Sequence, residues 1–252
     1  MSSEVRFSYE WQRYPEILPE YQMQFLKWVY PLTPSDFKNK TILDAGCGTG
    51  RNSYWPLIYG AKKVLAFDYD KRTVAVAKKN LVSFKNCLVR FGNIYAIPES
   101  NRFDISHAIG VIQHLEYPQA ALYQLVKATK KGGSVLVWVL AKEGNGWIIR
   151  FFSPVRFLTS RAPLSLVNLL AYFFTLPLYL YTHWHPTKHP YFVQLSNFRF
   201  SHLHSIVFDH LLPKIVNFWN KQEAINLLKD AGLTNVKIFR VNDNSWTVVG
   251  KK

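Results

Sequence analysis

Short apolar runs alternate with amphipathic stretches through the middle of the chain. Runs rich in apolar and β-branched side chains predict five strands, at 41–45, 64–68, 87–91, 104–109 and 134–140. Helical patterns lie between them, at 51–59, 73–80 and 118–130. Regular alternation of strands and helices is typical of a parallel sheet with right-handed crossovers. We therefore expect an α/β fold.

The C-terminal part predicts one more helix and a pair of strands. Asn220 is expected to cap a helix over 221–231, and Gly232 is expected to follow its end. Two β-prone runs come next, at 236–241 and 245–250, joined by a connector rich in turn residues. These elements would complete the sheet.

Two other local patterns affect the core. Tyr21, Phe25 and Trp28 recur at helical spacing, which predicts one buried helix face. Gly132 and Gly133 follow the helical pattern 118–130, so we expect them to break that helix before the strand at 134–140 begins.

The segment 142–218 departs from the alternation. It is rich in aromatic residues and contains a run without charge at 162–181, which as a straight helix would reach about 30 Å. Three interpretations stay open: a cap over an apolar substrate pocket, a membrane-contacting lid, and a transmembrane helix. Pro177 and Asn168 argue against a clean span, and we favour the cap.

The stretch 41–50 carries the first candidate chemistry. A buried strand there ends at Asp44 and Ala45 and runs into a turn with Gly46, Gly48 and Gly50. Glycines permit a sharp turn and let a ligand approach bare backbone. The spacing lacks the lysine of a phosphate-binding P-loop and differs from the dinucleotide fingerprint. A pyrophosphate site is therefore disfavoured.

A second acidic residue follows at a suggestive distance. Asp68 ends the strand 64–68, 24 residues after Asp44. A strand–helix–strand unit places a ribose-binding acid about 20 residues after the turn. Asp70 is expected instead to cap the helix that follows. We therefore predict that Asp68 binds the hydroxyls of an adenosine-bearing cofactor.

The pattern Asp-x-Gly-x-Gly-x-Gly resembles motif I of the class I S-adenosylmethionine-dependent methyltransferases. Other stretches are similar to the family at 92–98, 103–115 and 131–133, and Phe7-x-x-x-Trp11 resembles an N-terminal segment that covers the cofactor in one branch. The resemblance implies a Rossmann-like, mostly parallel sheet of seven strands with helices on both faces and the last strand antiparallel. It also implies S-adenosylmethionine as cofactor.

The resemblance assigns roles to particular residues. Asp44, Gly46 and Gly48 would hold the methionine portion, Asp68 the ribose, and Asn93 with Ile94 the adenine, with Asn93 replacing the family's aspartate. The remaining positions expected near the cofactor are Cys47, Tyr69 and Ile109.

Candidate residues for the acceptor side are fewer. His114, just after the fourth strand, is a candidate general base because its ordinary pKa is near neutrality. Asp209 and His210 are second candidates for acid–base chemistry. Residues expected to line the substrate region or its lid are Tyr9, Trp11, Tyr14 and His204.

Composition and charge limit the partners. The chain has 252 residues and a formal net charge of +15, which favours anionic partners such as nucleic acid, lipid headgroups or an acidic substrate. Cys47 and Cys87 cannot form a disulfide framework, and the N-terminus has no signal-peptide pattern, so a cytoplasmic location is expected, with membrane association open. Histidine pairs in the segment 142–218 lack accompanying cysteines or carboxylates, so no metal is expected.

The sequence thus predicts four parts: an aromatic N-terminal segment at 1–40, a cofactor-binding core at 41–141, a mainly helical cap at 142–218, and a closing helix and strand pair at 219–252. The predicted function is methyl transfer to a small or lipid-linked hydrophobic acceptor, with possible peripheral membrane contact. An RNA or DNA methyltransferase is the alternative enzyme, although no separate nucleic-acid module is recognisable. A non-catalytic S-adenosylmethionine-binding or membrane-docking protein is the alternative of another class.

Overall fold

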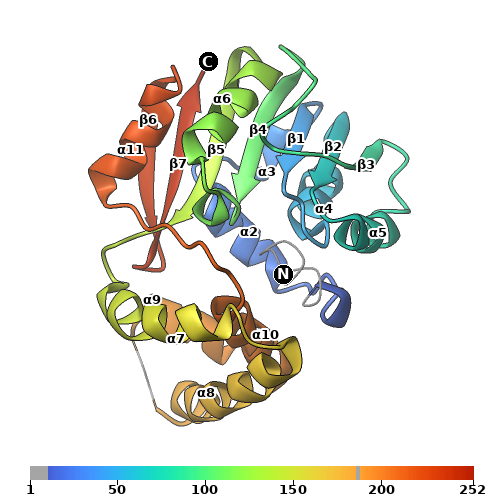
Figure 1. The fold of residues 1–252 in the computed structure, drawn as a ribbon. Helices are drawn as coiled ribbons and strands as arrows, with labels where there is room; N and C mark the ends of the chain where they lie inside the picture. The colour runs from blue at the N-terminus through green and yellow to red at the C-terminus, as the bar shows by residue number, and fades with distance from the viewer. Residues whose placement is uncertain (1–10, 186–187) are drawn as a thin grey trace.

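The computed structural model describes residues 11–185 and 188–252, and seven strands form one sheet in the order β3-β2-β1-β4-β5-β7-β6 (Figure 1). The strands are β1 Thr41–Ala45, β2 Lys63–Asp68, β3 Cys87–Phe91, β4 Phe103–Ile109, β5 Thr129–Leu140, β6 Thr234–Val241 and β7 Ser245–Lys251. Strands β1 to β5 pair in parallel, whereas β7 is antiparallel to both β5 and β6. The predicted Rossmann-like sheet is therefore confirmed.

Helices cover both faces of the sheet. Successive strand residues point to opposite faces, so each strand contributes side chains to two cores. Leu43 belongs to the core on one face, with Leu122 and Leu228 of two helices. Ile42 belongs to the core on the other face, with Phe25 and Val74. The covering helices are α2 Tyr21–Val29, α3 Pro34–Phe37, α4 Arg51–Ile58, α5 Lys71–Asn80, α6 Pro118–Ala128 and α11 Lys221–Asp230.

Side-chain caps fix the predicted starts of two helices. The Asp70 carboxylate accepts hydrogen bonds from the backbone of Arg72 and Thr73 at the start of α5. Asn220 accepts from the backbone of Glu223 at the start of α11, in a reciprocal capping box. Each satisfies backbone donors that a helix end otherwise leaves unpaired, so the predicted caps are confirmed.

The start of β5 differs from the expectation. The strand begins at Thr129, directly after α6, instead of at Ser134. Gly132 has a φ of +75°, and its N–H donates to the carbonyl of the C-terminal Lys252. The Lys252 N–H in turn donates to the carbonyl of Gly133. The two glycines therefore form an irregularity within the strand, because the chain's end supplies partners that a helix break would lack.

The segment between β5 and α11 is helical. It begins with a π-helical turn at Ile148–Phe152 and continues as α7 Ser153–Thr159, α8 Leu164–Trp184, α9 Pro190–Ser196 and α10 Phe200–Leu211. These helices form a separate layer at the lower end of the molecule in Figure 1. Val167 and Ala171 of α8 pack against Phe208 and Leu211 of α10 in a small core of their own. We call α7 to α10 the helical layer.

Candidate functional site

The turn after β1 lies where the strand order reverses between β1 and β4, which is where open α/β sheets bind ligands. The backbone N–H groups of Gly46 and Cys47 both donate to the carbonyl of Phe67 at 2.9 Å. Gly46, Gly48 and Gly50 have φ values of +79°, +53° and +86°. The turn thus needs left-handed conformations that glycine adopts without strain.

Two of these glycines face different surroundings. A Cβ on Gly46 would lie 2.5 Å from Cγ2 of Val111, inside the packed structure. The nearest described neighbours of a Cβ on Gly48 would be ring atoms of Trp11, no closer than 3.7 Å. Gly46 is therefore needed for close packing, whereas Gly48 presents bare backbone toward a space bounded by Trp11. This cradle fits a ligand that approaches the main chain.

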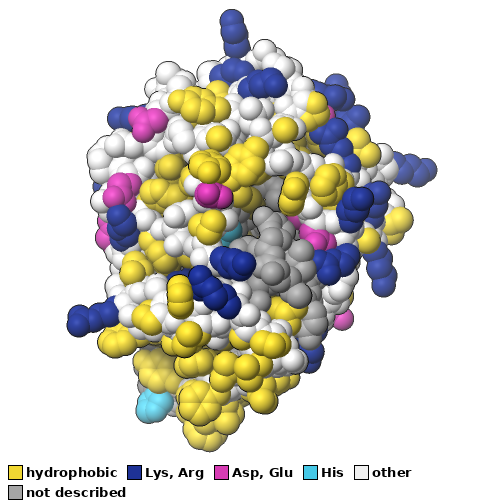
Figure 2. Space-filling model, in the orientation of Figure 1, with side chains coloured by type: hydrophobic (Ala, Val, Ile, Leu, Met, Phe, Trp, Pro, Cys, Tyr) yellow, Lys and Arg dark blue, Asp and Glu magenta, His cyan; other side chains and the backbone are white. Residues whose placement is uncertain are grey.

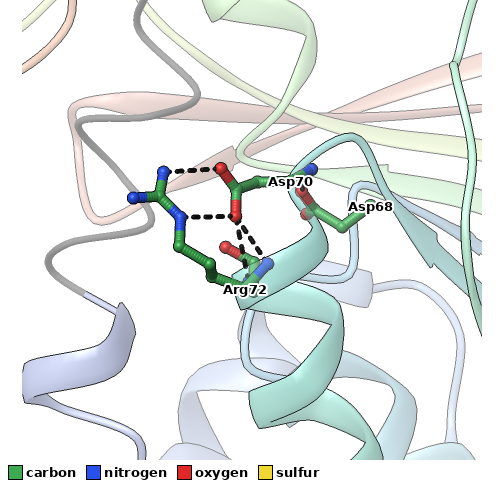
Figure 3. Close-up of polar contacts among 4 residues, drawn as sticks. Asp68, Asp70 and Arg72 are labelled. Atoms are coloured by element: carbon green, nitrogen blue, oxygen red, sulfur yellow. Dashed lines mark hydrogen bonds and ion pairs between the residues drawn. The ribbon is translucent and has the colours of Figure 1, made fainter.

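Asp68 lies beside this cradle, at the carboxyl end of β2. Its carboxylate accepts hydrogen bonds from Gly48 N at 3.0 Å and from Asp70 N at 3.1 Å. Burial raises the pKa of Asp68, and the backbone hydrogen bonds from Asp70 and Gly48 oppose that shift. Figure 3 shows Asp68 just before α5, next to Asp70, whose carboxylate binds Arg72. Asp68 and the glycine turn are thus joined directly.

Asp44 lies beneath the turn and is 1% exposed. One carboxylate oxygen accepts the Ser53 hydroxyl at 2.6 Å, and the other lies 3.4 Å from Nδ1 of His107 on β4. Burial raises the pKa of Asp44 and lowers that of His107, while each is opposed by the other's charge. No sequence pattern indicates the His107 contact, because it depends on the register that pairs Asp44 of β1 with His107 of β4. The predicted contact of Asp44 with the methionine portion stays a prediction.

The other predicted cofactor residues surround the same edge. Asn93 Oδ1 accepts the Tyr95 N–H at 2.9 Å, which fixes the loop after β3. Ile94 and Ile109 are buried in the two sheet cores, and Tyr69 is exposed. Cys47 is 2% exposed, and burial raises the pKa of its thiol well above the usual range. That thiol is therefore protonated and unreactive at neutral pH.

A cavity opens between the glycine turn, the N-terminal residues and α10. Its lining includes Trp11, Tyr14, Thr49, Arg51, His202 and Asp209. The structure thus brings together Trp11, Tyr14 and Asp209, which the sequence placed near the acceptor, and adds Arg51 and His202, which it missed. Another small cavity, lined by Thr41 and Lys63, lies at the amino ends of the strands, remote from the turn.

Arg51, which lines this cavity, lies among aromatic rings. Its guanidinium carbon lies 5.5 Å from the ring centre of Trp11, 5.2 Å from Tyr21 and 5.6 Å from Trp28. Cation–π contacts of this kind orient a charged head without a carboxylate partner. The aromatic pattern of the N-terminal segment was visible in the sequence, but its convergence on Arg51 required the tertiary structure.

His202 also lines this cavity. Its ring stacks on Phe198 at 3.9 Å, and its Nε2 lies 3.4 Å from the Tyr21 hydroxyl. Burial lowers the pKa of His202 to about 4, and the charge of Arg51 adds to the shift. His202 is therefore neutral at neutral pH and links α10 to α2.

A second polar contact joins the turn after β4 to the segment that follows α10. His114 Nδ1 lies 3.0 Å from the carbonyl oxygen of Ile215. A carbonyl only accepts, so Nδ1 carries the proton and Nε2 carries the lone pair in the neutral ring. Burial lowers the pKa of His114, and the hydrogen bond to Ile215 and the charge of Asp209 oppose this. His114 thus has the charge state and tautomer of a potential base.

The predicted acid–base residues converge here. Burial lowers the pKa of His210, the Asp209 charge opposes it, and Arg156 adds to it. Oδ1 of Asp209 is buried without a hydrogen-bond partner among the described residues. Arg156 is 7% exposed, and its guanidinium donates to the Ser153 hydroxyl at 3.1 Å. The structure thus groups His114, Asp209 and His210 and adds the buried Arg156, which sequence patterning missed.

The other two predicted lid residues, Tyr9 and His204, are not placed in the cavity lining by the structure. Tyr9 lies outside the described residues. His204 is 1% exposed, and its two ring nitrogens lie near Asn168 Oδ1, at 3.1 Å, and the Thr175 hydroxyl, at 3.3 Å. These partners lie within the helical layer, so the geometry favours packing over contact with a substrate. Within residues 11–185 and 188–252, no group of three or more His, Cys, Asp or Glu side chains could hold a metal ion.

Comparisons with known proteins agree with this geometry. Residues 36–142 match a family described as a methyltransferase domain. An uncharacterized methyltransferase of Schizosaccharomyces pombe is 31% identical over 155 residues, covering 58% of this chain and 50% of that protein. A tRNA U34 carboxymethyltransferase of Vibrio cholerae is 32% identical over 115 residues, covering 44% of this chain and 35% of that protein. The matched part thus spans half or less of these relatives.

Solved structures share the fold at low sequence identity. Human N-acetylserotonin methyltransferase in complex with S-adenosylmethionine has a TM-score of 0.59 at 14% identity, covering 100% of this chain and 56% of that one. A SAM-dependent methyltransferase from Aquifex aeolicus has a TM-score of 0.52 at 17% identity, covering 92% and 98%. The sequence matches therefore identify residues 36–142 as a methyltransferase domain, and the fold is that of S-adenosylmethionine-dependent methyltransferases of known structure.

Proposed function

We propose that this protein transfers a methyl group from S-adenosylmethionine to a small or lipid-linked hydrophobic acceptor. The observation that carries the proposal is the cavity in which Thr49 of the glycine turn, Trp11 and Asp209 meet. It lies between the edge of the sheet where the family's cofactor is expected and a helical layer rich in apolar side chains. An acceptor in this cavity would be shielded from water on several sides.

The residues around the turn suit the cofactor. When bound, S-adenosylmethionine supplies an activated methyl group on a sulfonium centre. Asp68 would accept hydrogen bonds from the ribose hydroxyls, and the bare backbone at Gly48 would allow close approach of the methionine portion. Arg51 supplies a positive charge next to the turn, suited to a carboxylate. Asn93 and Ile94 remain the proposed adenine contacts.

Deprotonation of the acceptor, where the acceptor needs it, is assigned to His114 and His210. His114 is neutral with its lone pair on Nε2, and His210 is neutral for the same reason of burial. A neutral imidazole can take a proton from an O–H or N–H group. The carboxylate of Asp209, of which Oδ1 is buried, would then stabilise the imidazolium that forms. An acceptor that is already a good nucleophile needs only orientation.

RNA is the second candidate acceptor. Relatives covering about two-fifths of this chain carry the name tRNA U34 carboxymethyltransferase, and the net charge of +15 favours a polyanion. Figure 2 shows Lys and Arg side chains distributed over the visible face, with hydrophobic side chains gathered at the lower end. That distribution favours the hydrophobic acceptor.

The test is transfer of labelled methyl groups from S-adenosylmethionine to three pools: a total lipid extract, a soluble metabolite extract, and total tRNA. We expect label in the lipid or small-molecule pool, lost in an Asp68→Ala variant. Label in tRNA alone would establish the RNA alternative. Cofactor binding without label in any pool would favour a non-catalytic binding protein.

A further inference from the structure

Helix α8 presents an unusual outer face. Large apolar side chains recur along it with helical spacing, at Leu166, Leu169, Leu170, Phe173, Leu176 and Trp184, and they are between 37 and 76% exposed. We call these six residues the outer face of α8. Figure 2 shows hydrophobic side chains gathered at the lower end of the molecule, where Figure 1 places α8.

The opposite face of α8 carries polar side chains besides the apolar Val167 and Ala171. Thr175 and Thr182 are buried, with their hydroxyls bonded to the carbonyls of Ala171 and Leu178 one turn earlier. Asn168 bonds His204 of α10 on the same side. A surface helix of a water-soluble protein normally points its apolar stripe inward and its polar stripe outward. Here leucines and phenylalanine also point outward, and an exposed apolar surface of this kind marks a site of contact with a partner or a membrane.

Length and composition would allow α8 to cross a membrane, and only 17% of its most apolar stretch is buried, so it is not an ordinary core helix. However, α8 packs along α10, which carries Ser205, Asp209 and His210. If α8 crossed the membrane while packed on α10, these polar groups would lie in the hydrocarbon core. A helix lying in the plane of the membrane surface keeps α10 and the sheet on the aqueous side.

The charged residues around α8 indicate which kind of surface its outer face contacts. The sequence from Gly144 to Phe208 contains no aspartate or glutamate, whereas Arg150, Arg161, Lys188 and Arg199 are exposed there. A second copy of this chain would bring like charges together across a symmetric contact. An anionic lipid headgroup layer is complementary in charge, and Trp184 at the end of α8 is typical of residues at membrane interfaces.

We propose that the outer face of α8 docks the protein in the plane of an anionic membrane surface, with Leu169, Phe173 and Leu176 inserted below the headgroups. Arg150 and Arg161 contact the headgroups beside it. This docking goes beyond methyl transfer and does not rest on it. It would place the cavity beside α10 close to acceptors that reside in the membrane.

The test is sedimentation with vesicles of phosphatidylcholine alone or mixed with phosphatidylglycerol, at low and high salt. We expect binding to the anionic vesicles that weakens at high salt but persists. Phe173→Glu should weaken it at least tenfold. Val82→Glu is the matched control, because Val82 is 81% exposed in the turn after α5, away from the helical layer; it should bind like the wild type.

Three results would overturn the proposal: no binding to either vesicle, equal binding by Phe173→Glu and the wild type, or a dimer in light scattering that Phe173→Glu dissociates without any vesicle binding. Circular dichroism and S-adenosylmethionine binding check that the variants fold. Because sedimentation requires no turnover, docking and methyl transfer can fail independently.

Discussion

Alanine at Gly46 and at Gly48 should separate packing from ligand binding in the same turn. At Gly46, the left-handed backbone costs roughly 1–2 kcal/mol for a residue with a Cβ. The new methyl would also lie 2.5 Å from Cγ2 of Val111, and such overpacking adds roughly 1–3 kcal/mol. Gly46→Ala should therefore lower the free energy of unfolding by roughly 2–5 kcal/mol.

In Gly48→Ala the nearest described neighbours of the new methyl are ring atoms of Trp11, at an ordinary contact distance of 3.7 Å or more. It should cost about 1 kcal/mol of stability, from the left-handed backbone alone. Its methyl group would narrow the cradle, so the affinity for S-adenosylmethionine should fall about tenfold or more, equivalent to roughly 1.4 kcal/mol.

Gly60→Ala is the matched control for Gly48→Ala. Gly60 also has a left-handed φ, of +83°, and its nearest neighbour would be Cγ of Lys38 at 3.7 Å, away from the turn. Urea unfolding measures stability, and calorimetric titration measures cofactor affinity. The reasoning is refuted if Gly46→Ala is no less stable than Gly48→Ala, or if Gly48→Ala and Gly60→Ala bind the cofactor equally well.

Three further changes test the fold. Burial lowers the pKa of His202 to about 4, so its contribution to stability is present above the ordinary pKa of 6.5 and is lost as the pH falls toward 4. Between pH 7 and pH 5 this loss of folding stability is about 2 kcal/mol. His202→Phe should remove that part of the pH dependence of urea unfolding. An unchanged pH dependence would contradict the lowered pKa of His202. Asn220→Ala should destabilise the protein by about 1 kcal/mol in the same assay through loss of the cap, and an effect near zero would contradict the capping role. The Leu125 side chain is 0% exposed, so Leu125→Ala should lower the free energy of unfolding by roughly 2–5 kcal/mol and lower the melting temperature clearly. A loss as small as that of a substitution at an exposed site would contradict the core packing.

The sequence predicted most of the sheet because local patterns determine its strands and helices. Apolar runs identified β1 and β3 with their observed bounds, and Asp70 and Asn220 marked helix starts through their capping chemistry. The distance from Asp44 to Asp68 also placed both at one edge, since parallel strands end on the same side. These features depend on neighbours in the sequence.

The features that were missed depend on distant segments. β5 starts at Thr129 because Lys252 supplies hydrogen-bond partners to the two glycines. Arg51 is surrounded by aromatic rings from Tyr21 and Trp28 of α2 and from Trp11, which precedes α2 in the chain. The buried Arg156 approaches His114 and His210 only because the helical layer returns to the sheet. Periodicity carries no information about such approaches.

Calorimetric titration of the purified chain with S-adenosylmethionine tests the central claim most directly. The wild type should bind one equivalent. Asp68→Ala should bind about 100-fold more weakly, because two hydrogen bonds to a charged carboxylate are worth roughly 3 kcal/mol or more. Asp70→Ala, which removes the adjacent cap, should retain the affinity. Absence of binding by the folded wild type, or equal affinity in Asp68→Ala, would contradict the account.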